Sequence, residues 1–98
     1  MSEIKLTVRT FRMDTDKRAA LKPLEEAAEV LGAWQEYDKW LGIDISEKYR
    51  IEERIMFADE IADCIQACVN LADRYGIDLQ AAMERCEERN RSRGRYDD

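Results

Sequence analysis

The chain has 98 residues, of which 39% are charged and 45% are hydrophobic, and this size and mixture are typical of one small folded domain. Its formal charge of −6 argues against a general binder of nucleic-acid polymers or of membrane surfaces, because both are anionic. There is no apolar stretch of membrane-spanning length and no signal peptide in residues 1–12, so we expect a cytoplasmic protein. The cysteines, Cys64, Cys68 and Cys86, are expected to be reduced thiols.

The first thirteen residues are predicted to form an arm. Ile4, Leu6 and Val8 alternate with polar residues, and this alternation predicts a short strand over residues 4–11. Because a lone strand is not stable in water, the segment either pairs with another subunit or remains an extended arm.

A helical region follows the arm. Asp14-Thr15-Asp16 offers an N-cap for a short helix through Leu21, and Pro23 either kinks this helix or opens a new one. Residues 24–40 are predicted to form the first long helix, because apolar residues recur there at helical spacing. These residues are Leu24, Ala27, Ala28, Leu31 and Trp34.

Two further helices are predicted. Gly42 and Asp44 mark a break, and Ser46 is a candidate cap for a helix over residues 47–75. Residues 61–72 are apolar nearly all round, which is typical of a helix that is buried on most sides. Gly76 is predicted to end this helix, and Asp78 is a candidate N-cap for a third helix over residues 79–89.

These elements predict an all-α fold, a small bundle of three to four helices. We expect a single domain over residues 1–98, with an arm (1–13), a helical core (14–89) and an arginine-rich tail (90–98). A core of this size is modest, and dimerisation would extend it.

Two pairs of acidic residues are the strongest functional signal. Glu26 and Glu29 form an E-x-x-E motif, and Glu60 and Asp63 form an E-x-x-D motif. Residues three apart share a helix face, so each pair presents two carboxylates in one direction. Four facing carboxylates repel one another unless protons or hard cations neutralise them. The pairs therefore predict a Mg²⁺ site, and Mg²⁺ in turn predicts phosphate chemistry.

Each acidic pair also has a simpler interpretation. Glu25, Glu26 and Glu29 are acids near a helix N-terminus, where the helix dipole stabilises negative charge. Glu60 and Asp63 belong to a polar stripe that continues through Gln66 and Asn70. This stripe either faces solvent or forms a buried polar seam, and its apolar flanks favour the seam.

Basic and aromatic side chains suggest how a phosphorylated substrate would bind. Arginines cluster in residues 85–95, and a guanidinium matches phosphate with two parallel hydrogen bonds. The alternative is a solvated, partly frayed C-terminus. Trp34 is a candidate platform for a base, although such residues more often belong to a core or a dimer interface.

The order of these motifs resembles that of the MazG-like all-α nucleoside triphosphate pyrophosphohydrolases, a superfamily that also contains dimeric dUTPases and phosphoribosyl-ATP pyrophosphatase. The family pattern is E-E-x-x-E, a spacer and E-x-x-D. The matching segments are Glu25-Glu26-Ala27-Ala28-Glu29, Glu60-Ile61-Ala62-Asp63, Asn70-Leu71-Ala72, Tyr75-Gly76-Ile77-Asp78-Leu79-Gln80-Ala81-Ala82 and Asn90-Arg91-Ser92-Arg93, followed by Tyr96. The similarity covers residues 20–96.

The resemblance implies Mg²⁺-dependent hydrolysis of a nucleoside triphosphate to the monophosphate and pyrophosphate, with Mn²⁺ as a substitute metal. It implies metal ligands at Glu26, Glu29, Glu60 and Asp63 and phosphate contacts at Asn90 and Arg93. Family members often carry a lysine where this chain has Cys86, so Arg85 or Arg89 would supply that charge. Members form homodimers or tetramers whose four-helix units complete the site, and we expect a homo-oligomer here.

The sequence leaves open which glutamate is the general base and which of three functions the protein has. Either Glu25 or Glu29 would accept the proton of the attacking water. Two other functions also fit the chain. One is a non-catalytic helical dimer that acts as an interaction or regulatory module, and the other is an enzyme similar to phosphoribosyl-ATP pyrophosphatase.

Overall fold

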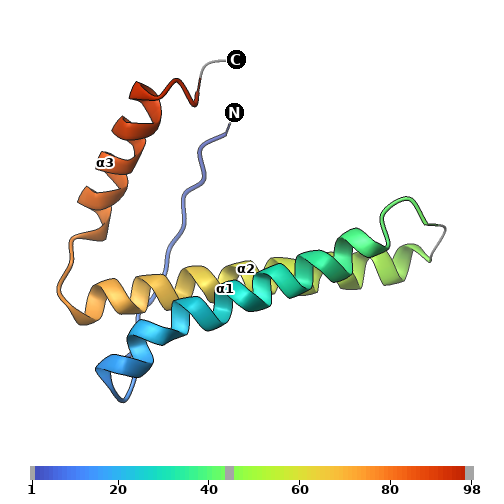
Figure 1. Cartoon of the computed structure of the whole chain (residues 1–98), viewed down its shortest axis with the longest axis horizontal. Coiled ribbons are helices and arrows are strands. Elements are labelled where there is room, and N and C mark those ends of the chain that lie inside the picture. The colour runs from blue at the N-terminus through green and yellow to red at the C-terminus, as the bar shows by residue number, and fades with distance from the viewer. Residues whose placement is uncertain (1, 44–45, 97–98) are drawn as a thin grey trace.

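The computed structural model describes residues 2–43 and 46–96, and all of the regular structure in these ranges is helical (Figure 1). The helices are α1 (Asp16–Lys39), α2 (Glu47–Arg74) and α3 (Leu79–Ser92). The first two pack side by side as a long hairpin, and α3 leaves the end of α2 on the same side as the N-terminal segment (Figure 1). The prediction of an all-α fold is confirmed.

The two helical segments expected on either side of Pro23 are one helix, α1. It begins after Thr15, whose Oγ1 accepts a hydrogen bond from the Arg18 N–H at 3.1 Å. Pro23 lies well inside the helix and has no N–H to donate to the carbonyl of Ala19. Helix α1 nevertheless continues, because its packing along α2 outweighs the loss of one hydrogen bond.

Local interactions delimit the other two helices where the sequence predicts. Ser46 Oγ accepts the Tyr49 N–H at 3.3 Å, and Asp78 Oδ1 accepts the Ala81 N–H at 3.0 Å. Gly76, with φ +62°, takes the left-handed conformation that ends α2. Helix α3 extends three residues beyond its predicted end, to Ser92. The break predicted at Asp44 lies outside the described residues.

The most buried apolar residues of the hairpin are small: Ala19, Ala67 and Ala72. Between α1 and α2, the rings of Tyr37 and Phe57 lie 5.5 Å apart. Several larger apolar residues of both helices are exposed instead. They are Leu24, Leu31 and Trp34 on α1, and Ile51, Ile55, Ile61 and Ile65 on α2. None of the helices in the described ranges has an apolar stretch long enough to cross a membrane.

The N-terminal segment is an extended arm, and the described residues contain no strand. Its root is attached to the C-terminal half of α2. Gln66 Nε2 donates to the carbonyl of Arg9 at 3.0 Å, and the Phe11 N–H donates to Asn70 Oδ1 at 3.1 Å. Arg74 adds a bond of 2.7 Å to the carbonyl of Met13. The C-terminal half of the predicted polar stripe, Gln66 and Asn70, therefore binds the arm.

This contact yields a prediction for Asn70, which is buried and accepts hydrogen bonds from both the Phe11 N–H and Gln66 Nε2. In Asn70→Ala both donors lose their acceptor, at a cost of about 1–3 kcal/mol for a buried unpaired group. We expect a lower free energy of unfolding in urea and faster hydrogen exchange at the Phe11 amide.

Asn70→Asp is the matched control, since its carboxylate still accepts both hydrogen bonds. That variant should retain a protected Phe11 amide. Unchanged exchange in Asn70→Ala would show that another contact holds the arm.

Candidate metal centre

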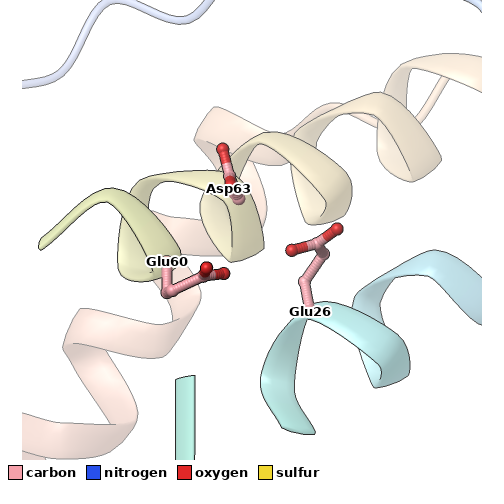
Figure 2. A group of neighbouring side chains, drawn as sticks. All are labelled: Glu26, Glu60 and Asp63. Carbon is pink, nitrogen blue, oxygen red and sulfur yellow. The ribbon is translucent and has the colours of Figure 1, made fainter. Parts of the chain in front are cut away.

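Three acidic side chains converge where the middle of α1 lies against α2 (Figure 2). Glu26 comes from α1, and Glu60 and Asp63 come from α2. Each offers one carboxylate oxygen, and these oxygens all lie within 4.8 Å of one another. Because the two helices contribute separate ligands, the cluster depends on the register of the hairpin.

Helical geometry explains why Glu26 and Glu60 face each other. Glu26 lies about two turns after Ala19 and about three turns before Tyr37, so all three share the face of α1 that packs on α2. On α2, Glu60 follows Phe57 by three residues and so lies on the face that turns toward α1. Both glutamates thus occupy positions that an apolar side chain would normally fill.

Glu26 is the most enclosed member of the cluster, with 7% of its surface exposed. Its Oε1 lies 3.0 Å from Lys22 Nζ, and this hydrogen bond raises the pKa of Lys22. Its Oε2 is buried without a hydrogen-bond partner, and so is Oε2 of Glu60. A buried carboxylate oxygen without a donor or cation is strongly unfavourable. Both oxygens are therefore suited to bind a cation.

The surroundings of Glu60 favour its protonated form in the absence of a cation. The pKa of Glu60 is raised above its ordinary value of 4.5, chiefly because burial disfavours the carboxylate. A hydrogen bond with the Glu29 carboxyl raises it further, as do the negative charges of Glu29, Asp63 and Glu26. A bound cation has the opposite effect on the pKa, so protons and cations compete for this cluster.

The donor set fits a hard divalent cation such as Mg²⁺ or Mn²⁺. All three donors are carboxylates, and the chain contains no histidine to favour a softer metal. Glu26 is buried, Glu60 is half-buried and Asp63 is exposed, so the cluster is enclosed on one side and reaches solvent on the other. Mg²⁺ is commonly held in this way, by a few carboxylates together with waters and substrate phosphates.

The fourth predicted ligand, Glu29, lies beside the cluster. Its side chain is exposed, and its carboxyl accepts a hydrogen bond from Glu60 when Glu60 is protonated. Glu25 is also exposed, and its Oε2 lies 3.8 Å from Lys22 Nζ. The structure thus brings together three of the four predicted ligands, while Glu29 contacts one of them and Glu25 faces a lysine.

The predicted phosphate-binding residues lie on or just after α3, away from this cluster. Arg85, Arg89 and Arg93 are exposed, and the half-buried Asn90 donates from Nδ2 to Cys86 Sγ at 3.7 Å. Asn90 lies about 16 Å along α3 from the start of that helix, and α3 diverges from the hairpin (Figure 1). Within one chain, α3 therefore does not bring these residues to the acidic cluster.

The sequence analysis did not identify Lys22 as part of the site. Lys22 precedes Glu26 by four residues, which is the spacing at which side chains meet on a helix. That spacing rule would have paired the two residues. It would not have shown that this ammonium group partly neutralises a buried carboxylate.

A cavity of about 240 Å³ lies at the loop end of the hairpin, where the sequence predicts none. Both helices and the intervening turn contribute to its lining, so no local motif signals it. Trp34, the candidate base platform, does not line this cavity and is 45% exposed on α1. The lining residues are Tyr37, Trp40, Leu41, Glu47, Arg50, Ile51, Glu53 and Arg54.

The raised pKa of Glu60 has a consequence for stability in EDTA. Between pH 4.5 and the folded-state pKa, the folded protein holds more protons than the unfolded chain. The contribution of the Glu60 carboxyl to the free energy of unfolding is therefore fully present below pH 4.5. It is lost as the pH rises through the pKa of Glu60 in the folded protein. We expect metal-free Glu60→Gln, which keeps a neutral side chain, to melt a few degrees above the wild type at pH 7.5.

This gain in melting temperature should shrink as the pH is lowered toward 4.5, because the wild-type carboxyl then becomes protonated. Glu52→Gln makes the same charge change at an exposed position of α2 and should show little gain. Equal melting temperatures for wild type and Glu60→Gln at pH 7.5 would contradict this account of the cluster.

Comparison of the chain with models of known protein families, with curated proteins and with solved structures finds no match. The case for a function therefore depends on the geometry of the acidic cluster and on the order of the motifs in the sequence.

Proposed function

We propose that the protein is a Mg²⁺-dependent nucleoside triphosphate pyrophosphohydrolase, which converts a ribo- or deoxyribonucleoside triphosphate to the monophosphate and pyrophosphate. The observation that carries this proposal is the cluster of Glu26, Glu60 and Asp63, in which two buried carboxylate oxygens have no partner. The motif order shared with the MazG-like enzymes supports the same function.

The three acids would hold the metal, and bound Mg²⁺ would offset phosphate charge and lower the pKa of a water. In the reaction, a water oxygen bonds to the α-phosphorus. The bond from that phosphorus to the bridging oxygen breaks, and pyrophosphate leaves with the electron pair. Arginine guanidinium groups are suited to stabilise the charge on the departing pyrophosphate.

Glu29 is the better of the two candidates for accepting the proton of the attacking water. It is exposed beside the cluster and in contact with Glu60, one of the three clustered acids, whereas Glu25 Oε2 lies 3.8 Å from Lys22 Nζ.

The shape of the chain supports a second copy. Its accessible surface is 8119 Å², whereas a folded monomer of 11.5 kDa is expected to expose about 5,800 Å². The excess of about 2,300 Å² is within the range that each subunit buries in an obligate dimer. The Cα radius of gyration, 16.6 Å, likewise exceeds the value of about 13 Å for a compact chain of this length.

The second copy would cover the outer face of α2. At 100° per residue, Ile55 and Ile65 lie within one sector of that helix, and Ile51, which also borders the cavity at the loop end, lies between them. Glu60 and Phe57, which face α1, lie on the opposite side. Helix α1 covers the side of α2 that carries Glu60 and Phe57, whereas the isoleucine side is exposed. We therefore propose a homodimer through this isoleucine face.

Such a dimer also offers a role for α3, which diverges from its own hairpin. Asn90 and Arg93 would then contact the phosphates held by the acidic cluster of the other copy. The alternative functions give different expectations: an interaction module would turn over no nucleotide, and a phosphoribosyl-ATP pyrophosphatase would prefer that substrate in a panel of triphosphates.

Substitution of a metal ligand tests the enzyme. Glu60→Gln should lower Mg²⁺-dependent pyrophosphate release at least about a hundredfold, because it removes a charged ligand. Pyrophosphate is measured with a panel of nucleoside triphosphates and phosphoribosyl-ATP. Glu52→Gln, on the same helix but away from the cluster, should keep wild-type activity. Full activity in Glu60→Gln, or no turnover by the wild type, would contradict the proposal.

Substitution on the outer face of α2 tests the dimer. Ile55→Glu places charges in the proposed interface, so we expect the chain to sediment as a monomer and to melt at a lower temperature. Ile55→Val keeps the face apolar and should remain dimeric. A monomeric wild-type chain in analytical ultracentrifugation would contradict the proposed assembly.

A further inference from the structure

The arm has features of a strand whose partner is another chain. Residues 2–13 contain no turn or bend, and within the part of the chain that the structure describes, residues 2–8 make no backbone hydrogen bond. Ile4 is 76% exposed and Leu6 is 63% exposed. An extended segment with alternating apolar residues and unpaired backbone groups readily adds to another strand.

The contacts of the arm with α2 indicate which edge of the arm is available to pair with another strand. The Arg9 carbonyl and the Phe11 N–H both point at α2, where Gln66 and Asn70 bind them. In a strand, the N–H and C=O of one residue point to the same side, and successive residues alternate. The backbone groups of the even-numbered residues, Ile4, Leu6 and Val8, therefore face the edge away from their own α2.

The sequence of the arm is self-complementary about Leu6. In an antiparallel pair of two arms centred on that residue, Leu6 lies opposite Leu6 and Ile4 lies opposite Val8. All these apolar side chains fall on one face of the ribbon. Glu3 then lies opposite Arg9 at both ends, and opposite charges across a strand pair are stabilising.

Neighbouring registers are less favourable. A pair centred on Lys5 places two lysines opposite each other, and a pair centred on Thr7 places Lys5 opposite Arg9. Like charges directly opposite are destabilising. A pair centred on Ile4 brings Glu3 opposite Lys5 but places Leu6 opposite the polar Ser2. The register centred on Leu6 is the one that satisfies both the charges and the apolar face.

We infer that the arms of two copies pair as antiparallel strands about a two-fold axis at Leu6, with Ile4, Leu6 and Val8 exchanging the backbone hydrogen bonds. Such a contact is isologous, as most homodimer contacts are. A two-stranded ribbon is only marginally stable by itself. The pairing therefore rests on the second copy proposed above, and it does not depend on hydrolysis.

Disulfide trapping in the full-length protein tests the register. In Leu6→Cys the two introduced thiols lie opposite each other, with Cα atoms about 5.5 Å apart, which suits a disulfide. In Ile4→Cys the two copies of residue 4 lie about 13 Å apart or more, too far for a disulfide. Under oxidation without nucleotide and in EDTA, Leu6→Cys should form a covalent dimer and Ile4→Cys should not. The wild type, whose native cysteines form no disulfide, gives the background.

A charge exchange tests the same register without cysteine. Glu3→Arg or Arg9→Glu alone puts like charges opposite each other at both ends of the ribbon, so the dimer dissociation constant should rise about tenfold. The double variant exchanges the two charges and should return to within about twofold of the wild type. Circular dichroism checks that the helices of each variant are intact.

The outcomes separate this inference from the proposals that precede it. If the wild type is a dimer but Leu6→Cys resists oxidation, or the double variant is as weak as the single ones, the arm pairing is wrong and the dimer stands. Trapping through Ile4→Cys instead would overturn the register. A monomeric wild type would overturn both the pairing and the dimer, whereas loss of pyrophosphate release in Glu60→Gln concerns the metal site alone.

Discussion

The carboxylates of Glu26 and Glu60 lie between α1 and α2, at positions where a helical hairpin would otherwise be closed by apolar side chains. Their burial works against the packing of the hairpin, because a charge between two helices has to be neutralised. Lys22 supplies part of that neutralisation, and protonation of Glu60 would supply more. A divalent cation would neutralise the cluster most completely, so binding at the proposed metal site would stabilise the hairpin.

The same hairpin has a small apolar core. Its most buried apolar residues are alanines, while Ile55 and Ile65 of α2 are exposed. An exposed apolar face of this extent is typical of a surface that another chain covers. The acidic cluster, the outward-facing isoleucines, the divergent α3 and the extended arm are together consistent with a site that is completed by assembly.

Much of the helical framework could be predicted because it depends on contacts between near neighbours in the chain. Thr15, Ser46 and Asp78 cap helices with their own side chains, and Gly76 ends α2 through its backbone conformation. Pro23 was ambiguous, since the packing of α1 against α2 decides whether a helix continues past a missing hydrogen bond. The motif spacing identified the acids, but it could not tell which of them converge.

The sequence by itself determined the helical class, the N-caps of α2 and α3 and the identity of the acidic residues, because periodicity and capping act over a few residues. The tertiary structure alone decided that Glu26 joins Glu60 and Asp63 while Glu29 lies beside them. It also decided that Gln66 and Asn70 hold the arm. These choices depend on the register of α1 against α2 and on contacts between residues far apart in the chain, which no local spacing encodes.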